Sequence, residues 1–228
     1  AVVLVPSSYD KQLGETFYST YMNYYEIDED KSVLIQDFTD LLIKESGKEI
    51  KVTVIESGTV NAFALPNGQI IIYSGILETM TGYEELAALL GHEMAHIHNR
   101  HSVKMMCRNL ASVLFISAVL SDVNSIMAVI ADNANQLQSL SFSRELEYEA
   151  DKGGLDLMFE LKINPKGMSS LFTQLQDGSN EIIPEFLSTH PVTADRIALV
   201  NQIIDSNDMV PEEHLELKSL FEALKAME

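Results

Sequence analysis

The sequence predicts a single α+β domain over residues 1–228 that is mostly helical and has a small, mainly antiparallel three-stranded sheet. Apolar residues recur at helical spacing along most of the chain, whereas residues 50–74 alternate as strands do. No internal repeat, low-complexity tract or linker divides the chain. We therefore expect N-terminal helices within 1–48, the sheet within 50–74, further helices within 83–161 and C-terminal helices within 165–228.

Two amphipathic helices are expected ahead of the sheet. The first runs from Tyr9 to Tyr25 and the second from Lys31 to Glu45, with Gly47 as a stop signal. Their apolar residues recur every three or four positions, which places them on one face of each helix. The residues expected to face inward are Leu13, Phe17, Tyr21, Tyr24, Val33, Ile35, Phe38, Leu41 and Leu42.

Three strands are expected next, at Ile50–Ile55, Asn61–Leu65 and Gln69–Tyr73. The segment Pro66-Asn67-Gly68 between the last two is typical of a tight turn, and so short a connection makes this pair antiparallel. Asparagine tolerates positive φ, so Asn67 suits such a turn.

One long helix is expected from Glu84 to about Met106, because this stretch contains no proline and a capping box at Thr81 and Glu84 precedes it. The apolar run at 110–131 is broken by Asp122, and each half is shorter than the about 20 residues that a bilayer span needs. A buried helical hairpin is favoured, with contact to a membrane surface or a partner as the alternative. Further helices are expected at Leu137–Leu161, Pro165–Leu175, Pro191–Ile204 and Pro211–Glu228.

The chain carries a formal net charge of −19 and one cysteine, Cys107. A surface this acidic repels nucleic acid and anionic lipid, so a phosphate-binding role is disfavoured. Solubility explains the acidity most simply, and a preference for basic substrates is the alternative. A single cysteine excludes an intrachain disulfide and a thiolate-rich metal site. Because the first residue is Ala1, we expect a piece of a longer chain, whose upstream part could hold a targeting or membrane segment.

The segment from His92 to His96 has the pattern H-E-x-x-H within the predicted long helix. Residues four apart lie on one face of a helix, so both imidazoles can bind one Zn²⁺ ion. Glu93 lies one position round from His92, where its carboxylate can reach a water on the metal without being a ligand. Such a glutamate takes a proton from the water and passes it to the leaving amine.

A catalytic zinc needs a third protein ligand and an open fourth position. The extended pattern with a third histidine six residues on is absent, because position 102 is Ser102. His98 and His101 have the wrong spacing and should point around the helix, as surface or second-layer residues. The third ligand is therefore expected from another helix, with glutamate as the usual choice.

The segment Ser143–Asp151 offers such carboxylates. Glu147 and Asp151 are four apart and can face the first helix together, one binding the metal and the other holding a ligand imidazole by its free N–H. Spacing favours Glu147 as the ligand without excluding the others. The small residues Ala150, Gly153 and Gly154 would let the two helices approach closely, and Glu145 and Glu149 should be solvated on the opposite face.

Four stretches together resemble the gluzincin family of zinc metallopeptidases, which includes the CAAX prenyl protease, the heat-shock protease HtpX and the mitochondrial protease Oma. They are Asn61–Gly68, Glu85–His96, Ser143–Asp151, and Thr189-His190-Pro191 with Asp195-Arg196-Ile197. The resemblance implies a zincin fold and one Zn²⁺ per chain, with the sheet beside the H-E-x-x-H helix. It also implies His92, His96 and Glu147 as ligands, Asp151 as the carboxylate behind them, and a cleft-edge strand to which a peptide substrate adds. That strand consists of Asn61, Ala62, Phe63 and Ala64.

Two further residues in the matching stretches have open roles. His190 could be a packing or capping residue, a fourth ligand that holds the enzyme latent, or a donor to the oxyanion of the reaction. Arg196 could stabilise the same oxyanion, or it could form an ion pair with Asp195 or Glu149.

The predicted function is that of a zinc-dependent endopeptidase acting on unfolded or extended polypeptides, with protein quality control as a conceivable setting. The alternative is a latent or non-catalytic metal-binding module that serves as a chaperone or docking domain. Family members with transmembrane helices carry longer apolar spans, so residues 110–131 favour the soluble branch. Membrane association through an upstream segment or through 110–131 stays open. A membrane-associated, periplasmic or cell-envelope location is favoured over the cytoplasm, and no nucleic-acid partner is expected.

Overall fold

The computed structural model describes residues 6–44, 49–109, 141–177 and 185–227. The α-helices are α1 (Asp10–Tyr21), α2 (Glu29–Ile43), α3 (Ser74–Glu78), α4 (Tyr83–His98), α5 (His101–Asn109), α8 (Arg144–Glu160), α9 (Lys166–Asp177), α10 (Glu185–Thr189), α11 (Ala194–Asp205) and α12 (Leu215–Lys225). The strands are β1 (Lys51–Ile55), β2 (Ala62–Ala64) and β3 (Gln69–Tyr73). This confirms the mostly helical α+β class.

The sheet has the strand order β1-β3-β2 and is mixed rather than mainly antiparallel. β2 and β3 form the predicted antiparallel hairpin, whose turn has its positive φ of 87° at Gly68 and not at Asn67. β1 pairs with β3 in parallel register, from Lys51 opposite Gln69 to Ile55 opposite Tyr73. β3 lies between the two earlier strands, antiparallel to β2 and parallel to β1.

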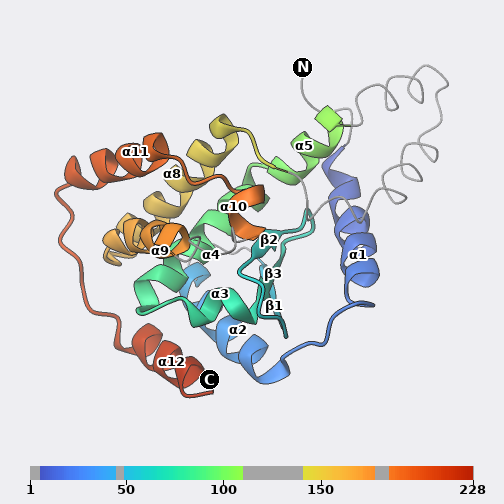
Figure 1. Ribbon diagram of the computed structural model, residues 1–228, viewed down its shortest axis with the longest axis horizontal. Coiled ribbons are helices and arrows are strands. Elements are labelled where there is room, and N and C mark those ends of the chain that lie inside the picture. Colours follow the sequence, from blue (N-terminus) through green and yellow to red (C-terminus); the bar gives the residue numbers. More distant parts are fainter. Residues whose placement is uncertain (1–5, 45–48, 110–140, 178–184, 228) are drawn as a thin grey trace.

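The central strand separates two hydrophobic cores. Ile70 and Ile72 belong to the larger core with α2, α4, α8 and α9, whereas Ile71 and Tyr73 belong to a smaller core with α1 and α5. Alternate residues of a strand point to opposite faces of the sheet, so a five-residue strand can serve both cores. Figure 1 shows the sheet between α1 on one side and the group α8, α9 and α11 on the other.

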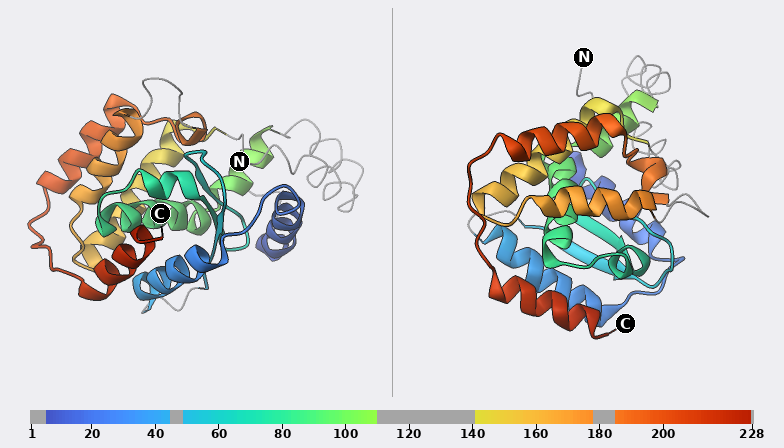
Figure 2. Two further views of the ribbon diagram at one scale, coloured as in Figure 1. Left: turned by 60° about the horizontal axis from the view of Figure 1, so that its bottom comes forward. Right: turned by 60° about the vertical axis from the view of Figure 1, so that its left-hand side comes forward.

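Helix α4 lies in the middle of the larger core. It packs against α8 and α9 and also contacts β2, while α2 packs on β1 and α12 on α2. The two views of Figure 2 show α2 and α12 side by side along one edge of the molecule. Residues Leu86 to Leu90 of α4 are all at most 1% exposed. The helix is therefore held by its surroundings on nearly every side, which suits a scaffold for a buried site.

Most predicted elements are present with ends shifted by a few residues, and α3 and α10 are additional short helices. Leu13, Phe17, Ile35, Phe38 and Leu42 are buried as expected. Tyr24 lies beyond the end of α1 and is 73% exposed, and Val33 is 59% exposed, so these two inward assignments were wrong. The helix predicted from Leu137 begins at Arg144. The apolar run 110–131 lies outside the described residues.

The long helix predicted from Glu84 to Met106 is in fact two helices. α4 ends at His98, and Arg100 then adopts the left-handed conformation with φ of 54° before α5 begins at His101. The guanidinium of Arg100 donates two hydrogen bonds to Asp10 of α1, at 2.7 and 2.6 Å. This contact ties the break to α1, and α5 leaves in a new direction (Figure 1).

In the described parts of the chain, no helix combines the length and the apolar character needed to cross a membrane.

Candidate metal centre

Helices α4 and α8 cross at a point where both helices carry glycine. A Cβ on Gly154 would lie 3.1 Å from the backbone nitrogen of His92, and a Cβ on Gly91 would lie 3.1 Å from Cα of Gly154. A Cβ on Gly153 would lie 2.6 Å from Cβ of Ala95. The predicted close approach is therefore confirmed, and it places the carboxylates of α8 against the histidines of α4.

Four side chains meet at this crossing. His92 and His96 come from α4, Glu147 from α8, and His190 from the residue after α10. One potential ligand atom from each lies within 4.8 Å of the others. Nε2 of His92 is 3.0 Å from Nε2 of His96 and 3.3 Å from Nδ1 of His190, which itself is 3.1 Å from Oε1 of Glu147. All four residues are at most 2% exposed.

A second layer of charge supports Glu147 and His92. Oδ1 of Asp151 lies 3.0 Å from Nδ1 of His92, so Nε2 of the same ring is left for the cluster. The fully buried Arg196 donates to both oxygens of Asp151, at 2.8 and 2.6 Å, and also pairs with Oε2 of Glu147. Burial opposes ionisation of Asp151, but the hydrogen bonds from His92 and Arg196 outweigh it and lower the pKa of Asp151.

The ion-pair partners expected for Arg196, Asp195 or Glu149, are not those found. In its third polar contact, Nη1 of Arg196 donates a hydrogen bond to the carbonyl oxygen of Pro191 at 3.0 Å. The guanidinium also lies 4.8 Å from the ring centre of Phe172. Every nitrogen of the guanidinium is thus engaged by Asp151, Glu147 or Pro191. The geometry favours Arg196 as the counter-ion of two buried carboxylates over a role at an oxyanion.

His101 was expected to point around the helix away from the site, as a surface or second-layer residue; the direction was wrong, and of the two alternatives the structure shows the second-layer one. Its side chain is fully buried, with Nδ1 2.9 Å from Nδ1 of His96 and Nε2 3.0 Å from Oε2 of Glu149. Glu149 is exposed on α8 as expected, yet it reaches this ring. The break before α5 returns His101 to the site. The left-handed position is held by Arg100 and not by the glycine or asparagine that usually marks such a break, so the residue type gave no signal.

Glu93 lies beside the four-residue cluster, and its only recorded side-chain contact within the described residues is a long one. Neither carboxylate oxygen forms a hydrogen bond of normal geometry within the described residues, and the nearest ionic contact is Nε2 of His190 at 3.7 Å from Oε1. The pKa of Glu93 is raised to about 7, chiefly by burial; the charge of Glu147 also raises it, while His92 and the backbone amide of Ala64 lower it. A fully buried, unbonded carboxylate is costly, and such groups concentrate at functional sites.

The strand predicted to bind substrate, Asn61–Ala64, forms the edge of the sheet. Asn61 and Leu65 exchange hydrogen bonds with β3, so the backbone groups of Ala62 and Ala64 point to the outer edge. The N–H of Ala62 donates to Oδ1 of Asn61 at 2.9 Å, and the carbonyl of Ala64 accepts from the Ser102 hydroxyl at 3.0 Å. Side chains of the protein thus occupy part of this edge.

His190 is held from three directions. Its ring stacks on Phe186 with centroids 4.5 Å apart, Phe142 lies 5.1 Å away, and its backbone N–H donates to the carbonyl of Phe186 at 2.7 Å. The ring therefore faces the cluster as part of a packed aromatic group and not as a loose surface side chain.

The family model for peptidase family M48 matches residues 34–204, three quarters of the chain. The chain belongs to peptidase family M48. It is 33% identical over 153 residues to the mitochondrial metalloendopeptidase OMA1 of Schizosaccharomyces pombe, covering 65% of this chain and 45% of that protein. It is 31% identical to the metalloprotease LoiP of Escherichia coli over 155 residues, or 66% of this chain and 61% of LoiP. A beta-barrel assembly-enhancing protease of Yersinia pestis is 27% identical over 64% of this chain and 32% of its own length.

The chain spans less than two thirds of the length of these relatives. The M48 match covers all four stretches that carried the resemblance, from Asn61 to Ile197.

M48 metallopeptidases use zinc, and the buried cluster fits one such ion. Three imidazoles and one carboxylate form an N₃O donor set of the kind that zinc prefers. The contact between Nε2 of His92 and Nε2 of His96 is short for two rings whose outer Nδ1 atoms lie 3.0 Å from Asp151 and 2.9 Å from His101. Lone pairs that converge in this way need a cation between them.

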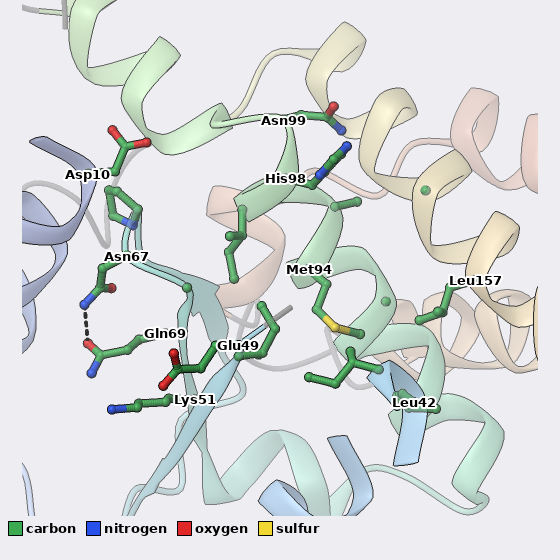
Figure 3. A pocket seen from close by; sticks show the side chains of 18 of the residues that line it. Asp10, Leu42, Glu49, Lys51, Asn67, Gln69, Met94, His98, Asn99 and Leu157 are labelled. Carbon is green, nitrogen blue, oxygen red and sulfur yellow. Dashed lines mark hydrogen bonds between the residues drawn. The ribbon is translucent and has the colours of Figure 1, made fainter. Parts of the chain in front are cut away.

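A cavity of about 750 Å³ lies on a different face of α4 from the cluster. Its α4 lining comes from Gly91, Met94, Ala95, Ile97 and His98 and does not include His92, Glu93 or His96. Figure 3 shows Met94, Leu42 and Leu157 at its apolar side and Lys51, Glu49 and Gln69 at its polar side. This cavity is therefore separate from the candidate metal centre.

Proposed function

We propose that this chain is a zinc-dependent endopeptidase domain in which His92, His96 and Glu147 hold the metal and Glu93 serves as general base and acid. The observation that carries the proposal is Glu93, a fully buried carboxylate that forms no hydrogen bond of normal geometry within the described residues and lies next to a ready N₃O donor set. A site built only to store metal has no use for such a group.

Bound zinc supplies a Lewis acid that polarises the scissile carbonyl and lowers the pKa of bound water toward about 7. The residues around it have separate tasks. Glu93, whose pKa of about 7 suits proton transfer in both directions, accepts a proton from the attacking water and returns it to the leaving amine. Asp151 fixes the tautomer of His92, and Arg196 holds Asp151 and Glu147 ionised.

The substrate class that we propose is an extended or unfolded polypeptide that adds as a strand to the outer edge of β2. Ala62 and Ala64 present their backbone groups there, and Glu93 lies close enough to Ala64 for its amide to influence the carboxylate. Asn61 and Ser102, which occupy part of this edge, would give way to the peptide.

The site as it stands supports a latent state as the second candidate. Nδ1 of His190 lies among the ligand atoms of the other three residues, so a metal bound by all four would have no open position. Removal of this imidazole would open the fourth position. On this proposal, a short loop after α10 decides between a closed centre and a catalytic one.

We further propose that the chain is one metallopeptidase domain of a longer protein that works at a membrane or in a cell envelope. The support is its partial coverage of relatives, which include a mitochondrial metalloendopeptidase and a beta-barrel assembly-enhancing protease.

Cleavage of casein by the zinc-loaded chain tests these proposals. We expect Glu93→Gln to reduce the rate by at least about 10²-fold, the lower end for loss of a general base. The control is Glu145→Gln, which changes an exposed residue of α8 and should cleave casein at the wild-type rate. A rise in rate in His190→Ala supports latency, whereas a fall supports a catalytic role for His190. Unchanged cleavage by Glu93→Gln would refute the peptidase mechanism.

A further inference from the structure

We propose that His101 and Glu149 are positioning residues that fix the tautomer of His96 and so aim its Nε2 lone pair at the metal. The inference deepens the proposed function and rests on it, because it concerns the same centre. It assigns a task to a buried histidine that lies outside the H-E-x-x-H pattern and to a glutamate on the solvent side of α8.

The three side chains form a continuous polar chain from the surface to the cluster. Oε2 of Glu149 is 3.0 Å from Nε2 of His101, whose Nδ1 is 2.9 Å from Nδ1 of His96. The side chain of Glu149 is 53% exposed, whereas those of His101 and His96 are buried. The only cation recorded near this carboxylate within the described residues, apart from the ring, is Lys104, at 3.6 Å.

The protons in this chain have one consistent arrangement. A carboxylate only accepts hydrogen bonds, so Nε2 of His101 must carry its proton toward Glu149. In the neutral ring, Nδ1 of His101 then bears a lone pair and accepts the proton that His96 carries on its own Nδ1. Nε2 of His96 is thereby left bare, and it faces Nε2 of His92 at 3.0 Å.

Without Glu149, the protons on His101 and His96 can take the opposite positions. The proton of His101 could then lie on Nδ1, where it would compete with the proton of His96. His96 would have to accept there and carry its own proton on Nε2, inside the cluster. A protonated Nε2 cannot bind a cation, so a protein molecule whose His96 carries its proton on Nε2 cannot use that ring to bind the metal.

The backbone break between α4 and α5 makes this contact. An uninterrupted helix would turn residue 101 away from residue 96, five positions earlier, because only positions three and four apart share a face. Arg100, at φ of 54°, redirects the chain so that the two rings meet with centroids 4.9 Å apart.

Zinc affinity of the full chain, measured by competition with a chromophoric chelator, tests the inference independently of catalysis. Loss of an outer partner of a metal-binding histidine typically weakens binding by about 10–100-fold. We expect His101→Leu to fall in this range and Glu149→Ala to fall near its lower end. His101→Asn should bind more tightly than His101→Leu, because an asparagine oxygen can replace the Nδ1 acceptor in a side chain of similar size.

Lys104→Met is the matched control, since it removes a neighbour of Glu149 but no member of the chain. It should change zinc affinity by less than about twofold, as expected for an exposed pair. The visible spectrum of the Co²⁺-loaded protein should shift in His101→Leu and remain unchanged in Lys104→Met. If His101→Leu does not fold, Glu149→Ala at the surface decides the question by the same two measurements.

Wild-type affinity and an unshifted cobalt spectrum in His101→Leu, or in Glu149→Ala if the first variant is unfolded, would overturn the inference. Equal weakening by His101→Asn and His101→Leu would also overturn it, because the acceptor atom would then be irrelevant. A wild-type chain that binds no zinc would overturn the proposed function as well. Normal wild-type binding with unaffected variants would overturn the positioning role alone.

Discussion

His92 and His96 lie one turn apart on the same helix, yet the protein supports them in different ways. Behind His92 is a carboxylate in direct contact, Asp151, which is itself locked by the buried Arg196. Behind His96 is a second imidazole, and the carboxylate comes only after it, half exposed at the surface. The first support is a closed ionic group inside the core, and the second is a buried imidazole followed by a carboxylate that is exposed to solvent.

This difference has energetic consequences. Buried ion pairs are expensive to break, because the remaining charge stays without a partner in a medium of low polarity. When a half-exposed carboxylate is removed, water can take its place beside the groups that it contacted. Changes on the His92 side should therefore affect folding and metal binding together, whereas changes on the His96 side should affect mainly metal binding.

The largest expected effect is that of Arg196→Met. The change leaves Glu147 and Asp151 as two facing carboxylates without a counter-ion, so the metal-free chain should lose about 3–5 kcal/mol of unfolding free energy. Urea denaturation of the metal-free protein measures the loss, with Arg144→Met on the exposed side of α8 as control. A loss below about 1 kcal/mol, the level of a surface pair, would contradict the buried ionic group.

The second prediction concerns the crossing that brings both supports together. Gly154→Ala places a Cβ 2.8 Å from Cε of Met168 and 3.1 Å from the nitrogen of His92, so α8 must shift away from α4. Overpacking of this kind costs about 1–3 kcal/mol. Gly58→Ala is the control, since no atom lies within 4 Å of its Cβ. Thermal unfolding should separate the two variants; equal midpoints would mean that the helices are not in close contact here.

A direct comparison of the two supports follows from Asp151→Asn and Glu149→Gln. Both replace a carboxylate by an amide of the same shape. Asp151→Asn should lower the unfolding free energy of the metal-free chain by over 1 kcal/mol, a typical cost of damage to a buried charged network, and Glu149→Gln by under about 0.5 kcal/mol. Both should weaken zinc binding. Equal losses of stability would remove the distinction between the two sides.

The smallest effect is expected at the break that creates the His96 side. Arg100 has φ of 54°, where a residue with a side chain is less stable than glycine by about 1 kcal/mol. Arg100→Ala and Arg100→Gly both lose the contacts with Asp10, so the difference between their unfolding free energies measures the cost of the left-handed backbone conformation alone. Arg100→Gly should be the more stable variant in urea. The reverse order, typical of a helix interior, would mean that α4 and α5 are continuous in solution.

How far the sequence predicts this molecule depends on how local each feature is. His92, His96 and Glu93 lie within one helical turn, so periodicity alone brings them together, and the glycines of α8 indicate the close crossing. The tight Pro66-Asn67-Gly68 turn likewise predicts the β2–β3 hairpin.

Features that depend on distant parts of the chain were not predictable in this way. The parallel β1–β3 pairing arises because β3 enters between two earlier strands, which no local pattern records. Arg196 finds its two carboxylate partners 45 or more positions earlier, and a single left-handed residue redirects His101. The proximity of His190 to the cluster came from the family resemblance and not from its own spacing.

The metal ligands proposed for this chain can be tested by the zinc content of three purified proteins: wild type, Glu147→Gln and Glu93→Gln. We expect one zinc per chain in the wild type and in Glu93→Gln, and strongly reduced zinc in Glu147→Gln, because Glu147 is in the donor set and Glu93 is not. A wild type without zinc, or zinc lost from Glu93→Gln and retained in Glu147→Gln, would contradict this expectation.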